Sequence, residues 1–262
     1  MTAGTGTGVW TYAITRSGGS GLSRLTGVGG ATARGVACAG LTAVVSDVSL
    51  EEFGEAALRR NLEDLDWLDE VARAHHHVID SASRMFELLP ARLATVYSGD
   101  AALCADLAAR RDRLLDTLHR VGGRAEWGVK GYAAPESGPA DRVPAAAGAE
   151  TDGTGLAYLK RRRAQLSAER DSRGAAVNGA RAVHAGLSRQ AEAARLLPPQ
   201  AAQLSEVRLP MLLNAAYLLP AGDGPGFASA VAAQASAHPE LRIELTGPWP
   251  PYSFVGDDDD GD

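Results

Sequence analysis

The chain has 262 residues, which is long for one domain and suits two domains of ordinary size. Hydrophobic residues make up 45% and charged residues 22%, so the chain has enough apolar side chains for a folded core. Its longest apolar runs fall well short of the ~20 residues of a membrane-spanning helix, and its net charge of −6 does not favour nucleic acid as a partner.

The N-terminal part of the chain is expected to build a sheet. Residues 1–8, rich in glycine and threonine, are expected to be flexible; they lack the layout of a signal peptide, so the cytoplasm is the expected compartment. Trp10–Thr15 combines aromatic and β-branched residues, which is typical of a strand. Residues 22–28 are expected to form a second strand. The apolar run Gly35–Asp47 is expected to form a third, buried one.

Three helices are expected after these strands. In Asn61–Phe86 the apolar residues recur every three or four positions and therefore share one face of a helix. A shorter helix from Leu50 leads into it, with Ser49 as the N-cap and Glu52 completing a capping box. The leucines of Asp100–Arg120 have the same helical spacing.

A pattern of strand, helix and strand occurs twice. Pro90–Tyr97 and Glu126–Tyr132 are predicted strands that flank the helix Asp100–Arg120. Pro210–Tyr217 repeats the spacing of proline and tyrosine, and a turn, a helix and the strand Leu241–Leu245 follow it. The repetition predicts two domains of related, ferredoxin-like type.

The domain organisation follows from a change in composition. Residues 134–155 are rich in proline, glycine and alanine and lack periodicity, which is typical of a linker. A long helical region, 156–197, comes next, and the acidic tail 256–262 is expected to be disordered. The expected fold class is α+β, with antiparallel sheets packed by helices. An N-terminal domain at 9–133 is joined through the linker and the long helix to a C-terminal domain at 156–255.

The cysteines and histidines do not form a metal motif. Cys38 and Cys104 share no short zinc-type spacing, and both lie in apolar segments, so they are expected to be buried free thiols. Three successive residues of a helix point in different directions, so His75, His76 and His77 cannot converge on one ion. We expect one buried, hydrogen-bonded histidine beside two surface ones.

No motif for catalysis or phosphate binding is present. Ser20 lies in GGSGL, which does not match the GxSxG elbow of serine hydrolases. Lys130 and Lys160 have no glycine-rich loop before them. The sequence therefore predicts a protein that is not an enzyme, without catalytic residues, metal or cofactor.

A basic stretch opens the long helical region. Lys160, Arg161, Arg162 and Arg163 are consecutive, but acidic residues follow and no aromatic residues are interleaved for base stacking. A helix face exposed to solvent is the favoured interpretation. Contact with a partner protein is the second interpretation, and binding of nucleic acid is the third.

The C-terminal segment Thr246–Phe254 differs from the rest of the chain. Three prolines and a glycine surround Trp249, Tyr252 and Phe254, so the segment is stiff and cannot be a central strand. Such a segment can cap a core, or it can offer aromatic anchors to a partner protein.

The sequence LTGPWPPYSFV, from Leu245 to Val255, resembles the C-terminal signature of the gas vesicle protein L/F family (GvpL/GvpF). Further blocks are similar to the family, in family order: VWTYAIT, LTAVVSDVSLEEFGE, NLEDLDWLDEVARAHHHVID, LLPARLATVY, EWGVKGY and AYLKRRR. Two features depart from the family pattern. Leu93-Ala94 stands where members often have a phenylalanine-glycine pair, and the acidic tail is extra.

The resemblance implies a non-catalytic accessory or minor gas vesicle protein, cytoplasmic and associated with gas vesicles. It implies two α+β domains and contact with the major shell protein GvpA, whose aggregation it would limit, and with other accessory proteins, but no cofactor, nucleic acid or membrane. We expect Trp249, Tyr252 and Phe254, beside an open sheet edge, to bind GvpA.

Three other functions stay open at this point. The first is a scaffold that bridges several accessory proteins. It would use the helix that carries Arg161 and Arg162 and the long helix that begins at Asn61. The second is an enzyme, which a deep pocket with convergent polar groups would support. The third is a nucleic-acid binder, which strongly salt-dependent binding to RNA or DNA would support.

Overall fold

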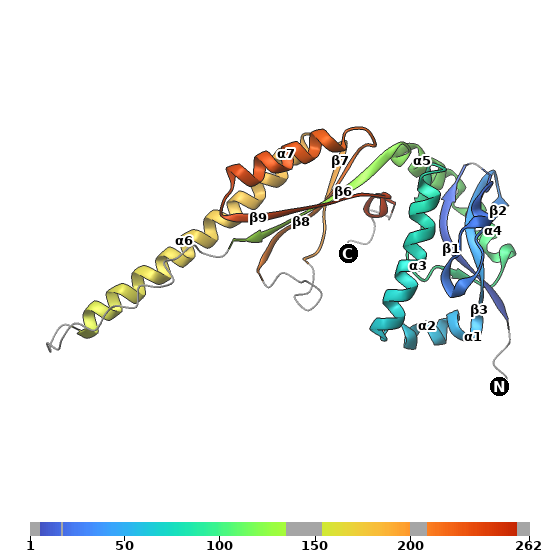
Figure 1. Ribbon diagram of the computed structural model, residues 1–262, viewed down its shortest axis with the longest axis horizontal. Helices are drawn as coiled ribbons and strands as arrows, with labels where there is room; N and C mark the ends of the chain where they lie inside the picture. Colours follow the sequence, from blue (N-terminus) through green and yellow to red (C-terminus); the bar gives the residue numbers. More distant parts are fainter. Residues whose placement is uncertain (1–5, 17, 135–153, 200–208, 256–262) are drawn as a thin grey trace. The chain divides into compact units, whose positions relative to one another are not determined.

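The computed structural model describes residues 6–16, 18–134, 154–199 and 209–255 (Figure 1). The chain forms two compact units. The first unit runs to Glu126 and includes the residues from Pro248 onward, and the second comprises Trp127–Gly247. Each unit has one antiparallel sheet packed by helices, so the predicted α+β class is confirmed.

The central strand of the first unit is β1. The sheet has the order β2-β3-β1-β4, and β5 also pairs with β1. All but the first residue of β1 are buried, as expected for a strand covered on both faces. The strands of this sheet are β1 (Thr7–Thr15), β2 (Arg34–Cys38), β3 (Leu41–Ser49), β4 (Leu88–Pro90) and β5 (Val96–Tyr97).

Three strand predictions in this unit are wrong. The run Gly35–Asp47 is a hairpin, because Ala39 and Gly40 both adopt a positive φ and reverse the chain between β2 and β3. Residues 22–28 contain 3₁₀ turns, η1 (Leu22–Arg24) and η2 (Val28–Gly30), instead of a strand. Pro90–Tyr97 is divided between β4 and β5, since Ala94 has a φ of 64° and interrupts the extended backbone.

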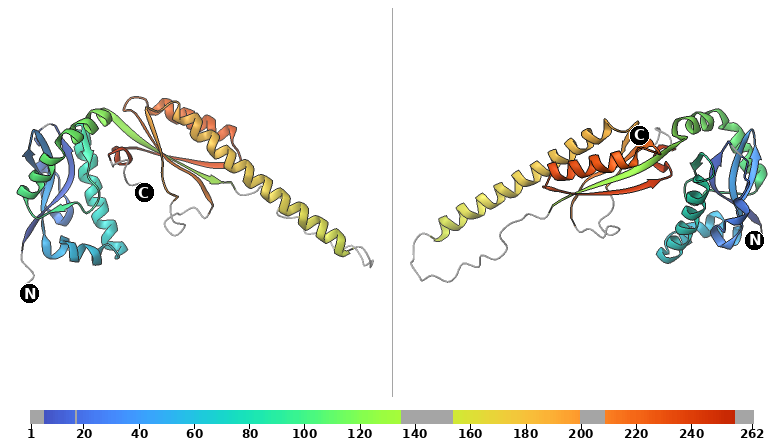
Figure 2. Two further views of the ribbon diagram at one scale, coloured as in Figure 1. Left: turned by 180° about the vertical axis from the view of Figure 1, so that it is seen from behind. Right: turned by 45° about the horizontal axis from the view of Figure 1, so that its top comes forward.

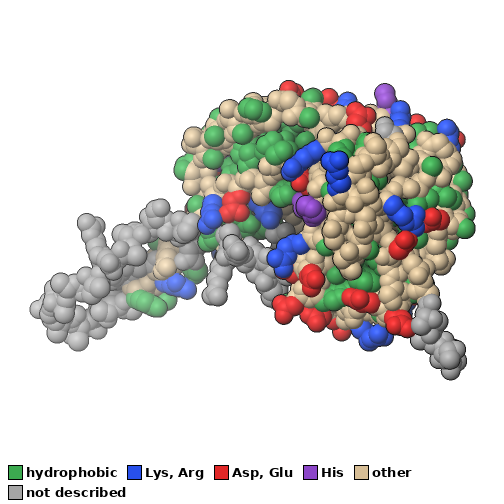
Figure 3. Space-filling model, turned by 45° about the vertical axis from the view of Figure 1, so that its right-hand side comes forward, with side chains coloured by type: hydrophobic (Ala, Val, Ile, Leu, Met, Phe, Trp, Pro, Cys, Tyr) green, Lys and Arg blue, Asp and Glu red, His purple; other side chains and the backbone are tan. Residues whose placement is uncertain are grey.

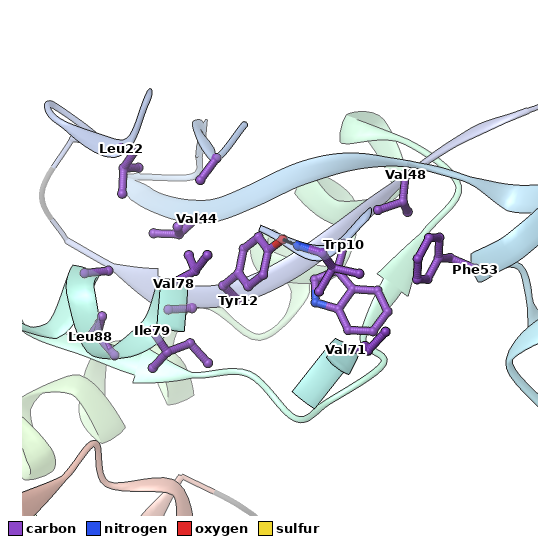
Figure 4. Close-up of a cluster of buried hydrophobic side chains, with 14 of the residues drawn as sticks. Trp10, Tyr12, Leu22, Val44, Val48, Phe53, Val71, Val78, Ile79 and Leu88 are labelled. Carbon is purple, nitrogen blue, oxygen red and sulfur yellow. Dashed lines mark hydrogen bonds between the residues drawn. The ribbon is translucent and has the colours of Figure 1, made fainter. Parts of the chain in front are cut away.

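The two largest side chains of β1 lie in one core, and the strand has a bulge beside them. The pairing of β1 with β3 shifts between Thr11 and Ala13, so Tyr12 is the extra residue. Trp10 and Tyr12 are both fully buried under α3, and Figure 4 shows them pointing to the side where Val78 and Ile79 lie. The Tyr12 hydroxyl is hydrogen-bonded to the Ser46 hydroxyl at 2.7 Å.

The helices of the first unit are shorter than predicted. Ser49 caps α1 by accepting a hydrogen bond from the Glu51 amide, and Gly54 separates α1 from α2. The long predicted helix Asp100–Arg120 is two helices, because Arg110 leaves the helical conformation. The helices are α1 (Leu50–Phe53), α2 (Glu55–Asn61), α3 (Leu65–Ser83), α4 (Asp100–Ala109) and α5 (Arg111–Val121).

The two cysteines form a disulfide, so the prediction of free thiols is wrong. Cys38 ends β2 and Cys104 lies in α4, and their Cα atoms are 5.1 Å apart. This separation is within the range that a disulfide bridges. The two cysteines are 66 residues apart in the sequence, so no local spacing indicates that they pair. They come together because α4 packs on β2.

The second unit has the element order βαββαβ, which is ferredoxin-like. Its strand order is β7-β8-β6-β9, and α6 and α7 lie side by side on one face (Figure 2). Small apolar residues of α6 at helical spacing pack on β8 in the core. The elements are β6 (Arg124–Ala133), α6 (Thr154–Ser188), β7 (Ala193–Leu196), β8 (Met211–Pro220), α7 (Gly224–Ala237) and β9 (Leu241–Trp249).

Two predictions for this part of the chain are wrong. The long helix ends at Ser188, and Ala193–Leu196 is the strand β7, which pairs with β8. The strand–helix–strand unit does not occur twice, because β5 belongs to the first sheet and β6 to the second. Most of the expected linker and the whole acidic tail lie outside the described residues.

Acidic side chains gather on one part of the first unit. Figure 3 shows them at the lower edge of the face in view, where α1 and α2 lie. The acidic residues of α1, α2 and the start of α3 are all exposed, as expected for a solvated surface. Among the described helices, none is long and apolar enough to cross a membrane.

Candidate functional site

The aromatic segment, Leu245–Val255, begins in an edge strand. It contains the end of β9 and the 3₁₀ turn η4 (Tyr252–Phe254). An edge strand tolerates Pro248, because a proline there removes no hydrogen bond that a neighbouring strand needs. Pro250 and Pro251 are buried, whereas Trp249 between them and Pro248 is 43% exposed.

Three hydrogen bonds hold the end of the segment. The amide and the hydroxyl of Ser253 both donate to the carboxylate of Glu126, at 2.7 and 2.6 Å. Burial raises the pKa of Glu126, although the hydrogen bonds from Ser253 act in the opposite direction. The guanidinium of Arg120 donates to the carbonyl oxygen of Phe254 at 3.1 Å. The segment is therefore attached to residues more than 120 positions earlier.

His76 of α3 connects the helix with the aromatic segment. Its Nδ1 lies 3.2 Å from the hydroxyl of Tyr252, and its ring centre lies 5.4 Å from that of Trp249. Tyr252 also packs against the core of the first unit, and burial raises its pKa. Tyr252 thus caps the core, while Trp249 keeps much of its surface available.

The three consecutive histidines have three different environments. His75 is 4% exposed, His76 is half-buried and His77 is exposed. The indole N–H of Trp10 donates to Nδ1 of His75 at 2.9 Å, so the ring proton is on Nε2 and faces the Ala91 carbonyl at 3.2 Å. Burial lowers the pKa of His75 to about 4. Within the described residues, no group of side chains suits a metal ion.

A cavity of about 380 Å³ lies in the first unit. Its walls come from β1, β4 and β5 and from α4 and α5, and Tyr252 and Val255 of the aromatic segment complete them. Next to it, Tyr97 donates to Asp106 at 2.6 Å, and Arg110 pairs with the same carboxylate. Burial raises the pKa of Tyr97 to about 12. Burial also opposes ionisation of Asp106, but the hydrogen bonds from Arg110 and Tyr97 outweigh it and keep that pKa low.

The predicted site residues lie in both units. Trp249, Tyr252 and Phe254 are brought together by η4 and the end of β9. Arg162 lies in α6 of the second unit; it is exposed and donates to Gln165 at 3.3 Å. The side chain of Arg161 is outside the described residues. Whether these residues bind a partner stays a prediction.

Sequence reasoning missed the residues that position the aromatic segment. The sequence pattern places Glu126 only in a strand, Arg120 only at a helix end and His76 only on the surface. Each contacts the segment across more than 120 residues of chain, and no local pattern signals such a contact. The only indication in the sequence is the group of three prolines, which restricts the backbone of the segment.

The chain matches the family model described as gas vesicle synthesis protein GvpL/GvpF over residues 8–256. It is 42% identical to gas vesicle protein L of Streptomyces sp. (strain CB03234) over 88% of this chain and 85% of that protein. It is 29% identical to gas vesicle protein L2 of Halobacterium salinarum over 90% of this chain and 86% of that protein.

Solved structures have the same fold. The crystal structure of the gas vesicle protein GvpF from Anabaena sp. PCC7120 superposes with a TM-score of 0.65 and 18% identity, covering 96% of this chain and 97% of that one. The GvpF structure from Microcystis aeruginosa gives 0.63 and 19%, covering 95% and 99%. The resemblance seen in the sequence is confirmed along its length, and the chain belongs to the gas vesicle GvpL/GvpF family.

Proposed function

We propose that this chain binds the major shell protein GvpA through the aromatic segment and limits its aggregation during gas vesicle assembly. Membership in the family supports an accessory role in gas vesicles. Membership does not identify the partner, and it does not establish a chaperone-like action or the absence of catalysis. These three points are part of the proposal.

The exposure of Trp249 carries this proposal. The segment holds this large side chain 43% exposed, while its neighbours Pro250 and Pro251 are buried. Aromatic side chains that protrude from a rigid support lose little conformational entropy on binding and are frequent anchors of protein interfaces. The contacts from Glu126 and His76 supply such a support.

The edge strand β9 offers a second element of recognition. It is the outer strand of its sheet, and Trp249 is its last residue. A β-rich shell protein that has not yet assembled exposes unpaired strand edges, which aggregate unless they are covered. Pairing of such an edge with β9 would cover it, and Trp249 would add an apolar contact.

Co-expression with GvpA tests the proposal. We expect the wild-type chain to keep GvpA soluble and to co-purify with it, and Trp249→Ala to lower the co-purified amount about tenfold. Tyr158→Ala is the matched control, because Tyr158 is also an exposed aromatic residue but belongs to α6. Wild-type retention of GvpA by a folded Trp249→Ala variant would exclude the segment as the binding site.

A scaffold that bridges other accessory proteins is the second candidate. It is favoured by exposed apolar residues on α6, Tyr158, Leu159 and Leu166, beside the exposed Arg162. In this case Tyr158→Ala, and not Trp249→Ala, would reduce the co-purification of accessory proteins. The same pair of variants therefore separates the two functions.

A further inference from the structure

The first half of α6 extends beyond the sheet of its own unit. Ala176, Ala180, Val183 and Leu187, in the second half of the helix, are buried in the core of that unit. From Tyr158 to Ala175, by contrast, every residue whose side chain is described is exposed. Figures 1 and 2 show this part of the helix running away from the strands of the unit. Helices gain most of their stability by packing one face against a partner, so this exposed half is a candidate docking element.

One face of this half combines leucines with arginines. Leu159 and Leu166 are seven positions apart, which is about two helical turns, so they lie on the same side of the helix. Both are large apolar side chains that remain exposed. Four exposed arginines follow the same side at helical spacing: Arg162, Arg163, Arg170 and Arg173. We call these six residues the leucine–arginine face. The stretch Leu159–Arg173 contains six basic and two acidic residues, so this part of the helix is positively charged.

The start of α3, in the first unit, carries leucines among carboxylates. Leu62 and Leu65 are 39% and 69% exposed, and the buried residues of α3 lie on the other face of the helix from Leu65. Asn61–Glu70 contains five acidic residues and no basic residue. All five acidic side chains are exposed: Glu63, Asp64, Asp66, Asp69 and Glu70. We call these five residues and the two leucines the leucine–carboxylate surface. Asp64 caps α3 and Asp69 is in an ion pair on α3, so the other three are the carboxylates offered to a partner.

We propose that the leucine–arginine face of one copy of this chain binds the leucine–carboxylate surface of a second copy. Guanidinium groups pair with carboxylates in charge-assisted hydrogen bonds, and the leucines of the two surfaces pack together between these pairs. Each exposed ion pair contributes little by itself, so the contact depends on several pairs and on the leucines together. We therefore expect self-association that is weak and sensitive to salt.

The composition of the two surfaces favours this occupant over others in the chain. Two leucine–arginine faces repel each other, because both are positive. The tail 256–262 has five aspartates, but it has no apolar residue that could cover Leu159 and Leu166. The leucine–carboxylate surface supplies both negative charge and apolar side chains. It belongs to the first unit and the leucine–arginine face to the second, so the contact joins different parts of two copies and closes into a ring or extends into a chain.

Sedimentation velocity of the full chain at increasing protein concentration tests the proposal. At low salt we expect the average mass to rise above that of one chain. At high salt we expect it to return toward one chain, because exposed charges are screened. A mass of one chain at every concentration would overturn the proposal, and this is the outcome if another protein or the same chain occupies the face. Trp249→Ala should self-associate like the wild type, so the result is independent of GvpA binding.

Two charge-reversed variants test the pairing of the surfaces. Arg162→Glu with Arg163→Glu reverses part of the leucine–arginine face. Glu63→Lys with Asp66→Lys reverses part of the leucine–carboxylate surface. All four positions are exposed, so we expect the fold to remain, which circular dichroism checks. Each variant alone should self-associate about tenfold more weakly than the wild type, because like charges then face each other.

A mixture of the two variants restores one complete interface. The first variant keeps its leucine–carboxylate surface and the second keeps its leucine–arginine face, so we expect the mixture to associate more strongly than either variant alone. A mixture that stays dissociated would overturn the proposal. Arg181→Glu with Arg189→Glu, at exposed positions outside the face, is the control for the change in net charge and should self-associate like the wild type. An equal loss in this control would assign the association to net charge and would also overturn the proposal.

The leucines separate a fitted contact from a general attraction between charges. Leu159→Ala removes an apolar group from the face, and we expect it to weaken self-association about threefold. Leu196→Ala, on β7, is the matched control because both leucines are 62% exposed, and it should have no effect. Wild-type self-association of Leu159→Ala would contradict the docking of the two surfaces, even if the charge-reversed variants dissociate.

Discussion

Both units pack a histidine of a long helix against an aromatic side chain of a central strand. In the first unit Trp10 of β1 donates to His75 of α3 at 2.9 Å. In the second unit Tyr217 of β8 lies at hydrogen-bond distance, 2.9 Å, from His184 of α6. The two contacts play equivalent parts, since each fixes how a helix sits on its sheet.

The surroundings of the two histidines differ. His75 is enclosed by large rings, those of Trp10 and Tyr12, and burial lowers its pKa to about 4. His184 is half-buried and lies beside the hydroxyl of Ser188. Elsewhere, α6 meets its sheet through small residues, Ala176, Ala180 and Val183. The comparison teaches that enclosure by large rings is what makes the protonation of His75 costly, because the charged imidazolium would lose its hydration there.

Removing the larger ring should affect the first unit most. Trp10→Ala creates a large cavity and leaves Nδ1 of His75 without its donor, so we expect it to lower the free energy of unfolding by about 3–5 kcal/mol. Urea denaturation measures the change, and amide hydrogen exchange shows whether the second unit keeps its protection. Trp249→Ala, which truncates an exposed tryptophan, should cost less than about 1 kcal/mol. Similar costs for the two variants would contradict the assigned core.

The disulfide between Cys38 and Cys104 is a second difference between the units, because both cysteines belong to the first unit. It closes a loop of 66 residues, so reduction should lower the stability of this unit by about 2–4 kcal/mol. Urea unfolding with and without a reductant measures the effect. The variant with Cys38→Ser and Cys104→Ser should be insensitive to the reductant. If the wild-type chain is equally insensitive, the bond does not stabilise the fold.

Acid should weaken the first unit through His75. The folded pKa of about 4 lies below the ordinary 6.5, so the unfolded chain binds a proton first as the pH falls. The contribution is present in full above pH 6.5 and is lost between 6.5 and 4, which amounts to about 2 kcal/mol between pH 7 and pH 5. Urea midpoints at several pH values measure this dependence.

Two glutamine variants separate this histidine from its neighbours. His75→Gln should flatten the dependence on pH between 7 and 5, whereas His77→Gln, at an exposed position, should keep it. An unchanged slope in His75→Gln would assign the dependence to other groups.

The smallest expected effect comes from Ala94. Its φ of 64° is in the left-handed region, where glycine has no steric cost. Ala94→Gly should therefore raise the stability by about 0.5–1 kcal/mol. Ala105→Gly, at an exposed position of α4, should lower it by about 1 kcal/mol. Thermal melts of the two variants measure both changes, and a shift in the same direction would contradict the strained conformation.

Leu93 and Ala94, which lie between β4 and β5, have different roles. In the structure Leu93 packs against the core as an apolar residue must, while Ala94 adopts the backbone conformation that a glycine would take freely. Leu93 thus contributes to the packing of the core, and Ala94 contributes backbone strain.

The sequence by itself determined the α+β class, most of the helices and the family. Residues with helical spacing, such as Leu103, Leu107, Leu114 and Leu118, are buried as predicted. Periodicity and capping act within a few residues of chain, so they can be read locally. The composition of the proline-rich segment also indicated that it is not a central strand, and its residues up to Trp249 belong to an edge strand.

Only the tertiary structure decided how distant segments meet. The disulfide of Cys38 with Cys104, the attachment of Ser253 to Glu126 and the pairing of β7 with β8 join elements that carry no local sign of one another. The cavity of the first unit has the same origin, since its walls come from three strands, two helices and the C-terminal segment. Such contacts depend on the sum of many weak packing energies, and no single stretch of sequence contains that sum.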